Sequence, residues 1–562
     1  MLQPDEIHDH AEHADAEVRE YRIFGPPGTG KTTNLSRQVH RAAERFGTNS
    51  VLVTSFSKAA ATELAGRELP ITPDRIGTLH SHCWHVLGGP EIAEANVADW
   101  NRDNPGLQLT PARKQNKLDG EESIIGEEPS SIEKDGDAWL QKLGRFRGLM
   151  IPQASWPPDL REFSERWTTY KQAAGLFDFT DLIERALLDT WTAPGNPSVI
   201  FADEAQDLNR MQLSLIRRWG EHAHHFIVCA DDDQTIYAWT GATPEAVLDP
   251  PIPDEHVIVL KQSYRVPRVV HALADRLIHT VGRRQEKVYL PRDFEGRVER
   301  LSGNGWLSPE YLILKATEEH VSRGQSVMFL ASCAYMLAPY IAALRGAGIP
   351  FHNPYRKASG AWNPLSTTRP GSSSNRVLAM LAAHPSMGEE ARPWRFSDVH
   401  LWTGWMASQG VLKHGAKKWI AEKDQSVVAS VADLDKIFES AALESLLDTF
   451  DGDGNGLLAW WRDHVASAHR QRLSFPLRIA NARGAQALAR EPQVVIGTIH
   501  SVKGGEADAV FLIPDLSNAG NAAYDRKGPT KDSVIRLFYV GLTRARETVY
   551  ICAPESAKAI RI

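Results

Sequence analysis

The stretch Tyr21–Thr33, YRIFGPPGTGKTT, decides how the first part of the chain folds. A short apolar run ends at Gly25, two more glycines follow, and the segment closes on Lys31-Thr32-Thr33. This is the spacing of a P-loop, whose glycines allow a tight turn that aims backbone N–H groups at phosphate oxygens. We therefore predict a strand before the loop and a helix over residues 31–46, whose N-terminal end adds positive potential.

The residue types in this loop suit the phosphates of a nucleotide. Lys31 supplies a mobile positive charge for the outer phosphates, and the Thr32 hydroxyl can ligate Mg²⁺. The competing interpretation is a glycine-rich turn that binds nothing, but the strand before the loop and the amphipathic pattern after it favour the P-loop. The predicted nucleotide-binding residues are Gly25, Pro26, Pro27, Gly28, Thr29, Gly30, Lys31, Thr32 and Thr33.

Composition indicates an ordinary globular protein of several domains. The 562 residues exceed what one core holds, and 42% hydrophobic with 24% charged residues leave room for substantial cores. No apolar run approaches the roughly 18 residues of a membrane span, and the acidic N-terminus lacks the regions of a signal peptide, so we expect a cytoplasmic protein without a membrane partner. Four scattered cysteines indicate neither a disulfide framework nor a paired-cysteine metal site. The net charge of −7 argues mildly against nucleic acid, yet an aromatic groove can bind a single strand within an acidic total.

Strands and helices alternate after the P-loop, a rhythm typical of a parallel sheet. We predict a strand over 51–53 that runs into a helix, and a second strand within 75–87, RIGTLHSHCWHVL. Ligands bind beyond the carboxyl ends of such strands, so segments 55–57 and 78–81 should lie on the nucleotide side. The histidines and cysteine of the second segment also permit a metal site, but side chains of a strand point alternately to opposite faces, which argues against one.

An acidic pair follows a third strand, predicted over 199–202, after a polar, helical insertion at 88–177 whose middle, 118–137, should be an exposed loop. In a chain with a P-loop, a carboxylate at the end of a buried strand holds Mg²⁺, and its acidic neighbour orients and deprotonates the attacking water. We assign the first role to Asp203 and the second to Glu204. The alternative, a solvated acidic helix start, is disfavoured by the four apolar residues ahead.

Polar and aromatic side chains follow the next predicted strand, 226–230. We expect Gln234 to sense the terminal phosphate, and Tyr237 and Trp239 to offer flat faces to unpaired bases. An aromatic pair is more often part of a core, but its place after a sheet strand in a nucleotide-binding domain favours base stacking.

With these residues in place, the chain resembles the superfamily-one DNA helicases of the UvrD, Rep and PcrA type. The resemblance runs from residue 23 to residue 552, and the segments follow the order of the family's motifs. The matching segments are GPPGTGKT (25–32), TSFSKAAATEL (54–64), GTLHSHC (77–83), DFTDLI (178–183), DEAQD (203–207), ADDDQTIYAWTGA (230–242), LKQSYRVP (260–267), GTIHSVKGGEADAVFL (497–512) and IRLFYVGLTRARE (535–547).

The resemblance implies a role for residues far apart in the chain. Tyr264 would stack on adenine, Glu506 would hold the ribose, and Arg265 and Arg544 would reach the γ-phosphate. The implied catalytic residues are Lys31, Glu204, Gln234, Arg265 and Arg544, with Thr32 and Asp203 on the metal. The implied DNA-contacting residues are Phe56, His80, Tyr237, Trp239 and His500.

Three departures from the family pattern bear on these roles. The glutamine that reads adenine in the family has no matching setting here, since residues 1–22 contain only Gln3. The segment at 54–64 is one residue shorter than usual, which affects the placement of Phe56. Thr240 stands where an arginine is common, which would weaken coupling between the phosphate and DNA sites.

The fold predicted from these patterns is α/β, with two RecA-like parallel-sheet cores that are each interrupted by a mostly helical insertion. Within the second insertion, residues 451–456 imitate the start of a calcium loop, but Arg462 occupies the position of the required Glu, so we predict a turn between helices. The predicted divisions are 1–87 with 178–262 for the first core, 88–177 for its insertion, 263–358 with 492–562 for the second core, and 359–491 for the second insertion.

Three functions remain open on the sequence alone. The first is an ATP- and Mg²⁺-dependent helicase that moves 3′ to 5′ on single-stranded DNA and unwinds tailed duplexes. The second is a DNA-stimulated translocase that joins a nuclease or defence complex. The third is a subunit that binds nucleotide without hydrolysis, which the joint presence of Lys31, Glu204, Arg265 and Arg544 disfavours.

Overall fold

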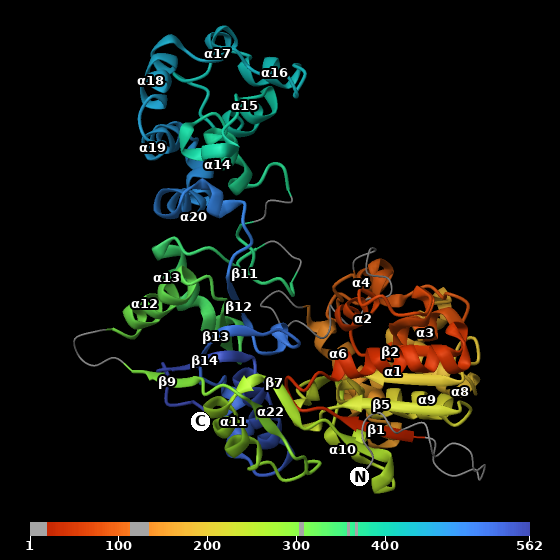
Figure 1. Cartoon of the computed structure of the whole chain (residues 1–562). Coiled ribbons are helices and arrows are strands. Elements are labelled where there is room, and N and C mark those ends of the chain that lie inside the picture. Colours follow the sequence, from red (N-terminus) through yellow and green to blue (C-terminus); the bar gives the residue numbers. More distant parts are fainter. Residues whose placement is uncertain (1–19, 113–133, 303–307, 357–359, 366–368) are drawn as a thin grey trace.

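Two parallel sheets form the core of the computed structural model, which describes residues 20–112, 134–302, 308–356, 360–365 and 369–562 (Figure 1). The first sheet takes its strands from residues 20–259 and the second from residues 297–552, and each has six strands. The predicted α/β class with two sheet domains is confirmed. The residue divisions between cores and insertions stay a prediction.

The first sheet has the strand order β3-β2-β4-β5-β1-β6. Its central strands are buried along their whole length, because helices cover both faces of a parallel sheet and the strands become continuous apolar runs. The predicted strands at 51–53, 199–202 and 226–230 are confirmed. The strands are β1 (Glu20–Phe24), β2 (Val51–Ser55), β3 (Ile76–Thr78), β4 (Val199–Asp203), β5 (His225–Ala230) and β6 (Val257–Val259).

Helices on the first sheet start where the sequence supplies a cap or a glycine turn. The predicted helix after the P-loop is confirmed as α1 (Lys31–Phe46), which buries Leu35 and Val39 against one face of the sheet. Asp178 and Asn209 each accept a hydrogen bond from a first-turn backbone N–H, which fixes the start of the next helix. The remaining helices of this core are α2 (Lys58–Ala65), α3 (Leu79–Val86), α8 (Phe179–Asp189), α9 (Arg210–Gly220) and α10 (Pro244–Leu248).

The predicted short strand within 75–87 is confirmed as β3, but the expectation that His80 and His82 lie on a strand is wrong. The Thr78 side chain accepts a hydrogen bond from the backbone N–H of Ser81 at 3.2 Å and starts α3 directly after the three-residue β3. His80, His82 and Cys83 therefore lie on a helix, and all three are buried. His82 Nε2 lies 3.2 Å from the carbonyl oxygen of Val53 on β2, which makes it part of the packing between helix and sheet.

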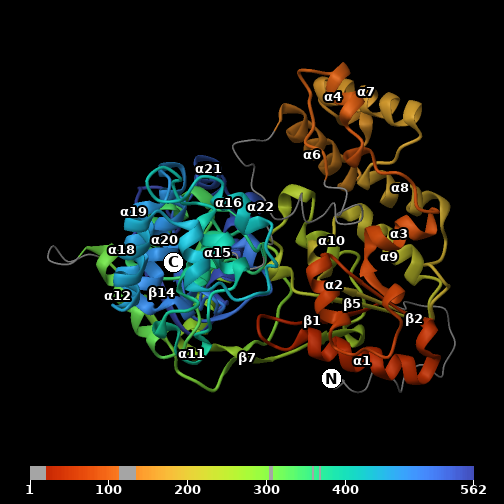
Figure 2. The same cartoon turned by 90° about the horizontal axis from the view of Figure 1, so that it is seen from above.

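The first insertion projects to the side of the first core and has a hydrophobic core of its own (Figure 2). Trp100 lies at its centre, with its ring centroid 5.9 Å from that of Phe163 and 5.0 Å from that of Trp167. Most of the loop predicted at 118–137 lies outside the described residues, and its last residues, from Asp135, begin a helix. The helices are α4 (Ala98–Asp103), α6 (Asp135–Gly148) and α7 (Pro158–Ala174).

The second sheet has the order β11-β12-β10-β13-β14-β9, and its strands are also parallel. Strand β10 is buried at every residue. The strands are β9 (Arg297–Leu301), β10 (Val327–Ala331), β11 (Phe351–His352), β12 (Val494–Thr498), β13 (Ala507–Leu512) and β14 (Ala545–Cys552). The helices are α11 (Arg268–Ile278), α12 (Pro309–Ser322), α13 (Ala338–Ala347), α21 (Asn518–Asp525) and α22 (Pro529–Leu542).

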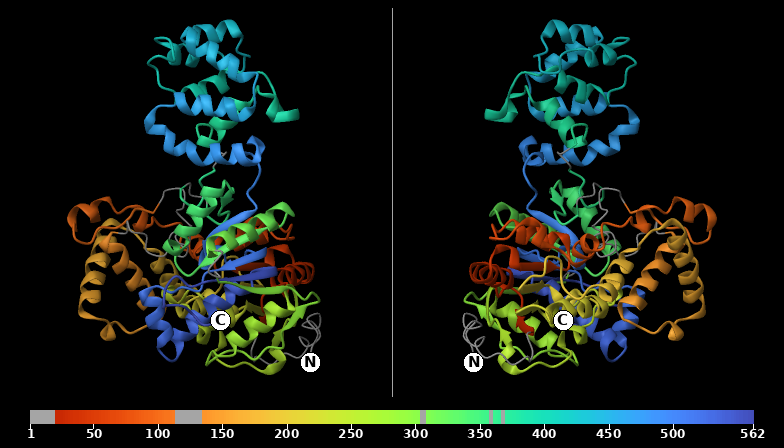
Figure 3. Two further views of the ribbon diagram at one scale, coloured as in Figure 1. Left: turned by 90° about the vertical axis from the view of Figure 1, so that its left-hand side faces the viewer. Right: turned by 90° about the vertical axis from the view of Figure 1, so that its right-hand side faces the viewer.

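The second insertion stands above the second core, to which two passages of chain join it (Figure 3). Its buried side chains continue the hydrophobic core on one face of the second sheet. A turn between helices is present as predicted, but it covers only residues 451–453, because residues 454–456 already belong to α19, which Asp453 caps by accepting from the Gly456 N–H. The helices are α14 (Ser373–Leu381), α15 (Phe396–Thr403), α16 (Ala416–Ala421), α17 (Val431–Ile437), α18 (Ser440–Phe450), α19 (Gly454–His464) and α20 (Ser467–Arg483).

A two-stranded element of β7 (Gln262–Pro267) and β8 (Leu290–Arg292) connects the cores. We call residues 262–292, which include these strands and α11, the connecting segment. It follows the last strand of the first sheet, and α11 packs against α22 of the second core. Within the described part of the chain, no helix is both long and apolar enough to cross a membrane.

Candidate functional site

The P-loop joins the end of β1 to α1 at the carboxyl edge of the first sheet. The Gly25 N–H donates to the carbonyl of Ala230 on the neighbouring β5 at 3.0 Å, which holds the start of the loop on the sheet. Gly28 and Gly30 have φ of 74° and 77°, a left-handed backbone that side chains disfavour. A Cβ at Gly25 would lie 2.0 Å from Lys31 Cγ, so the Lys31 side chain folds back across the loop through space that only glycine leaves.

Lys31 meets the acidic pair at the end of β4. Its Nζ lies 3.3 Å from Glu204 Oε1, and Glu204 has a left-handed backbone with φ of 50°. Such a conformation costs about 1–3 kcal/mol in a non-glycine residue and is found at functional sites. Burial acts to raise the pKa of Glu204, but the charges of Lys31 and Lys503 lower it to about 2, so this carboxylate is ionised at neutral pH. Asp203 ends β4 and is 3% exposed.

The connecting segment lies directly on the P-loop. The Tyr264 N–H donates to the carbonyl of Gly28 at 2.8 Å, and Pro27 accepts from the hydroxyls of Ser263 at 2.9 Å and Tyr289 at 2.8 Å. Tyr264 as a residue is 73% exposed, so its side chain is accessible to a ligand beside the loop. Next in the chain, Arg265 donates from Nε to Glu506 Oε2 of the second core at 2.6 Å.

Arg544 precedes β14 of the second core and reaches the first core. It donates from Nη2 to Gln234 Oε1 at 2.9 Å and from Nε to its own helix at Val540 O at 3.0 Å. Burial, together with the charge of Arg265, lowers the pKa of Arg544 to about 9. Arg265 of the connecting segment and Arg544 of the second core thus lie near each other, the first beside the P-loop and the second on Gln234.

Aromatic side chains from both cores form one cluster, the aromatic cluster, which consists of Phe56, Tyr237, Trp239 and His500. Ring centroids lie 5.2 Å apart for Phe56 and Tyr237, 5.2 Å for Tyr237 and Trp239, and 4.5 Å for Trp239 and His500. Phe56 and Tyr237 are only 4% and 6% exposed, so in this arrangement the rings pack against each other. Burial lowers the pKa of His500 to about 4, and the ring is therefore neutral at physiological pH. The predicted His80 packs edge-on against Phe179 at 6.1 Å.

The structure adds Lys503, which the sequence analysis passed over. Its Nζ contacts Asp207 Oδ2, lies 3.7 Å from Glu204 Oε2, and sits 5.2 Å from the centre of the Tyr237 ring. A single cation therefore touches both the acidic end of β4 and the aromatic cluster. The sequence does contain an indication of this role. Lys503 stands beside two glycines in the segment SVKGGE, and a charged side chain in such a short connection between strands can adopt few directions.

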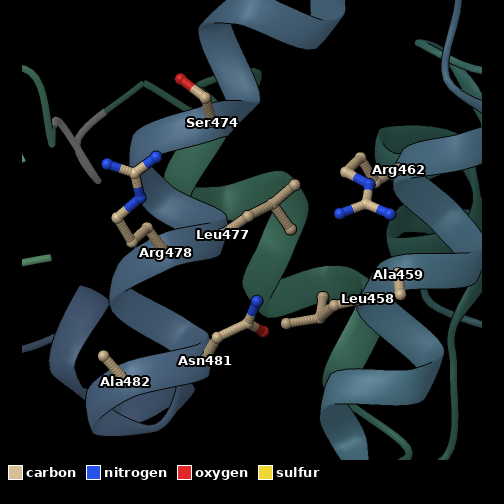
Figure 4. A pocket seen from close by; sticks show the side chains of 8 residues that line it. All are labelled: Leu458, Ala459, Arg462, Ser474, Leu477, Arg478, Asn481 and Ala482. Carbon is tan, nitrogen blue, oxygen red and sulfur yellow. The ribbon is translucent and has the colours of Figure 1, made fainter. Parts of the chain in front are cut away.

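A cavity of about 390 Å³ lies in the second insertion, between α19 and α20 (Figure 4). Leu458 and Leu477 line it between the two helices, and Arg462 and Arg478 line it on opposite sides. The Arg478 guanidinium already donates to the carbonyls of Arg345 and Gly346. The cavity is distant from the P-loop (Figure 1), and its arginine serves the joint between insertion and core.

Two protein-family models match the chain. The model of the UvrD/REP helicase N-terminal domain matches residues 10–250, and that of the UvrD-like helicase C-terminal domain matches residues 493–552. The chain is 24% identical to the ATP-dependent DNA helicase UvrD2 of Mycobacterium tuberculosis, over 93% of this chain and 75% of the relative. It is 24% identical to UvrD1 of the same organism over 48% of this chain, and 25% identical to YjcD of Bacillus subtilis over 46%. The matched parts span only 38% of UvrD1 and 36% of YjcD.

Proposed function

Because the chain belongs to the UvrD/Rep type of superfamily-one DNA helicases, whose named relatives are ATP-dependent, we propose that it hydrolyses ATP to move 3′ to 5′ along single-stranded DNA and to unwind tailed duplexes. We assign this activity to replication, repair or recombination. The observation that carries the proposal is that two arginines from beyond the first sheet in sequence contact its nucleotide site. Arg265 lies against Gly28 of the P-loop, and Arg544 donates to Gln234.

ATP would bind with its phosphates in the P-loop and its base on the open face of Tyr264. Backbone N–H groups of residues 28–33 and the ammonium of Lys31 would bind the phosphates, and Glu506 would accept from the ribose. Thr32 and Asp203 supply hydroxyl and carboxylate oxygens, the hard ligands that suit Mg²⁺. When bound by these residues, the metal would neutralise negative charge on the phosphates.

Glu204 would orient the attacking water and take its proton. Its low pKa keeps it ionised, and Lys31 and Lys503 hold its side chain at the end of β4. Arg265 and Arg544 stabilise the charge that develops on the γ-phosphate, and Gln234 senses the same group. Arg265 now pairs with Glu506, so ATP binding must exchange that ion pair for contacts with phosphate and ribose.

Translocation would follow from opening and closing of the cleft between the cores. The arginines stabilise the transition state only when the cleft is shut, so hydrolysis removes the charge that holds it closed. Phe56, His80, Tyr237, Trp239 and His500 are the proposed contacts for unpaired bases. The closed packing of Phe56 against Tyr237 means that bases enter only after these rings separate.

The test is an ATPase and unwinding assay on the wild type and on Glu204→Gln. We expect ATPase activity that single-stranded DNA stimulates strongly, its loss in the variant, and unwinding of duplexes with a 3′ tail but not a 5′ tail. Stimulated ATPase without unwinding would point to a translocase that needs a partner. A wild type without DNA-stimulated ATPase would refute the proposal.

A further inference from the structure

Three consecutive aspartates after β5 form a buried acidic cluster. Asp231, Asp232 and Asp233 are 0–1% exposed, and their nearest carboxylate oxygens lie within 4.8 Å of one another. Such a group resembles a cation site, but a protein cation already occupies its centre. Lys287 Nζ lies 2.8 Å from Asp231, 2.5 Å from Asp232 and 2.9 Å from Asp233, and its side chain is 1% exposed.

Lys287 belongs to the connecting segment and not to the first core. Its neighbours reinforce the same contact: Arg284 donates to both oxygens of Asp233 at 2.9 and 2.6 Å, and the Gln285 N–H donates to Asp232 Oδ2 at 2.8 Å. From α22, Arg536 donates to the Asp232 carbonyl at 2.9 Å. Every side-chain oxygen of Asp232 and Asp233 therefore faces donors from beyond the first sheet.

Asp231 differs from the other two because it also contacts Gln234. Its Oδ1 faces Lys287 at 2.8 Å, and its Oδ2 accepts from Gln234 Nε2 at 2.7 Å. A carboxamide carries its donors and its acceptor on opposite branches. Fixing Nε2 on Asp231 therefore turns Oε1 away from it, to the position where Arg544 donates at 2.9 Å.

We propose that Lys287 and Asp231 are positioning residues that hold the Gln234 amide in the orientation in which its oxygen meets Arg544. The relay runs from Lys287 through Asp231 and Gln234 to Arg544, and it begins in the segment that connects the cores. Movement of that segment thus changes the phosphate sensor directly. The inference rests on the proposed function, since Gln234 has a phosphate to sense only if the chain binds and hydrolyses ATP.

The test is a double-mutant cycle on the DNA-stimulated ATPase, with kcat and KM for ATP measured separately. Lys287→Met and Asp231→Asn should each lower kcat roughly 10- to 100-fold with little change in KM, since they misplace a group that acts in the transition state. In a Gln234→Ala background, either change should cause less than about twofold further loss, because the group they position is gone.

Arg284→Met is the matched control. It removes a partly buried cation from the same cluster, but its partner is the carboxylate of Asp233, whereas the Gln234 amide bonds to the carboxylate of Asp231. Its effect on kcat should be smaller and should persist unchanged beside Gln234→Ala. Asp231→Asn keeps the size of the side chain and leaves Lys287 with two carboxylates, so it carries the test if Lys287→Met does not fold.

The outcomes separate this inference from the proposed function. Full additive losses with Gln234→Ala, or a wild-type kcat for Asp231→Asn, would overturn the positioning role while the helicase proposal stands. Absence of DNA-stimulated ATPase in the wild type would overturn both.

Discussion

Gly28→Ala should release the connecting segment from the P-loop. Gly28 has φ of 74°, and a Cβ there would lie 2.5 Å from Arg265 Cβ and 2.8 Å from Ser263 Oγ. Contacts under 3.0 Å essentially never occur for real Cβ atoms, so the segment must move. The hydrogen bond from the Tyr264 N–H to the Gly28 carbonyl is then the first to break.

Two costs add at this position. A left-handed backbone costs an alanine about 1–2 kcal/mol relative to glycine. Overpacking of a closely fitted contact costs a further 1–3 kcal/mol, approximately. Only the second cost depends on the neighbouring segment, so opening of the segment becomes easier by about 1–3 kcal/mol, which corresponds to roughly 5- to 150-fold.

Hydrogen exchange measures this opening without nucleotide. We expect a peptide covering residues 262–267 to exchange its amides roughly 5- to 150-fold faster in Gly28→Ala than in the wild type. ATPase kcat/KM should fall as well, since Tyr264 and Arg265 move with the segment.

Gly30→Ala provides the control. Its φ of 77° carries the same backbone cost, but the nearest atom to the new Cβ is Thr33 Cβ at 4.0 Å. Exchange of residues 262–267 should stay within about twofold of the wild type in this variant. Equal exchange rates in the two variants would refute the steric argument and show that backbone strain alone explains both.

Three more predictions concern chemistry and stability. Glu204→Gln should lower kcat about 10²- to 10⁴-fold, the contribution of a general base, while nucleotide affinity measured by equilibrium titration changes little. Lys171→Met should destabilise the first insertion by about 1.5–3 kcal/mol, since it removes a charged donor at 2.5 Å from the buried Asp178, which keeps Arg147 at 3.1 Å. Urea unfolding should show this effect, and it should show less than about 1 kcal/mol for Lys418→Met, because Lys418 belongs to a surface ion pair and is 84% exposed. Burial lowers the pKa of His82 to about 4, below its ordinary 6.5, so its unfolded form takes up a proton that the folded form refuses. The contribution of neutral His82 to the free energy of unfolding is fully present above pH 6.5 and is lost as the pH drops towards 4, by up to on the order of 3 kcal/mol. Melting temperatures between pH 7 and 4.5 should therefore fall less in His82→Gln than in the wild type.

Local patterns were enough to predict the sheets and the P-loop. The glycine spacing and the apolar face of residues 31–46 each specify local structure, and both appear as expected in α1 and the loop before it. The prediction for the segment after Thr78 was wrong because its polar residues follow neither the period of a strand nor that of a helix. Only the threonine cap marks the start of the helix. The hydrogen bond from the Ser81 N–H to the Thr78 hydroxyl, at 3.2 Å, starts a helix where the residue types had suggested a strand.

The site was less accessible to sequence, because much of it consists of contacts between distant residues. The basic run RRQEK at 283–287 is typical of a solvated surface, yet Lys287 is buried in the acidic cluster of a segment more than 50 residues earlier. Pairing of this kind depends on how the cores dock. The same holds for Lys503, whose partners Asp207 and Glu204 lie on the opposite core.

Two short segments connect the proposed phosphate site with the proposed DNA site, and their shortness has a mechanical consequence. In the first core, residues 234–239 run from Gln234, which bonds to Arg544, to Trp239 in the aromatic cluster. In the second core, residues 500–506 run from His500 in that cluster to Glu506, which bonds to Arg265. Each segment includes residues of a 3-10 helix, Ala238–Thr240 in the first core and His500–Val502 in the second, so neither is a long flexible loop. Lys503 touches both sides through Asp207 and Tyr237. We therefore expect that a shift of the arginines on loss of the γ-phosphate moves the rings. Linkage then requires the converse, that separation of the rings by DNA changes the affinity for nucleotide.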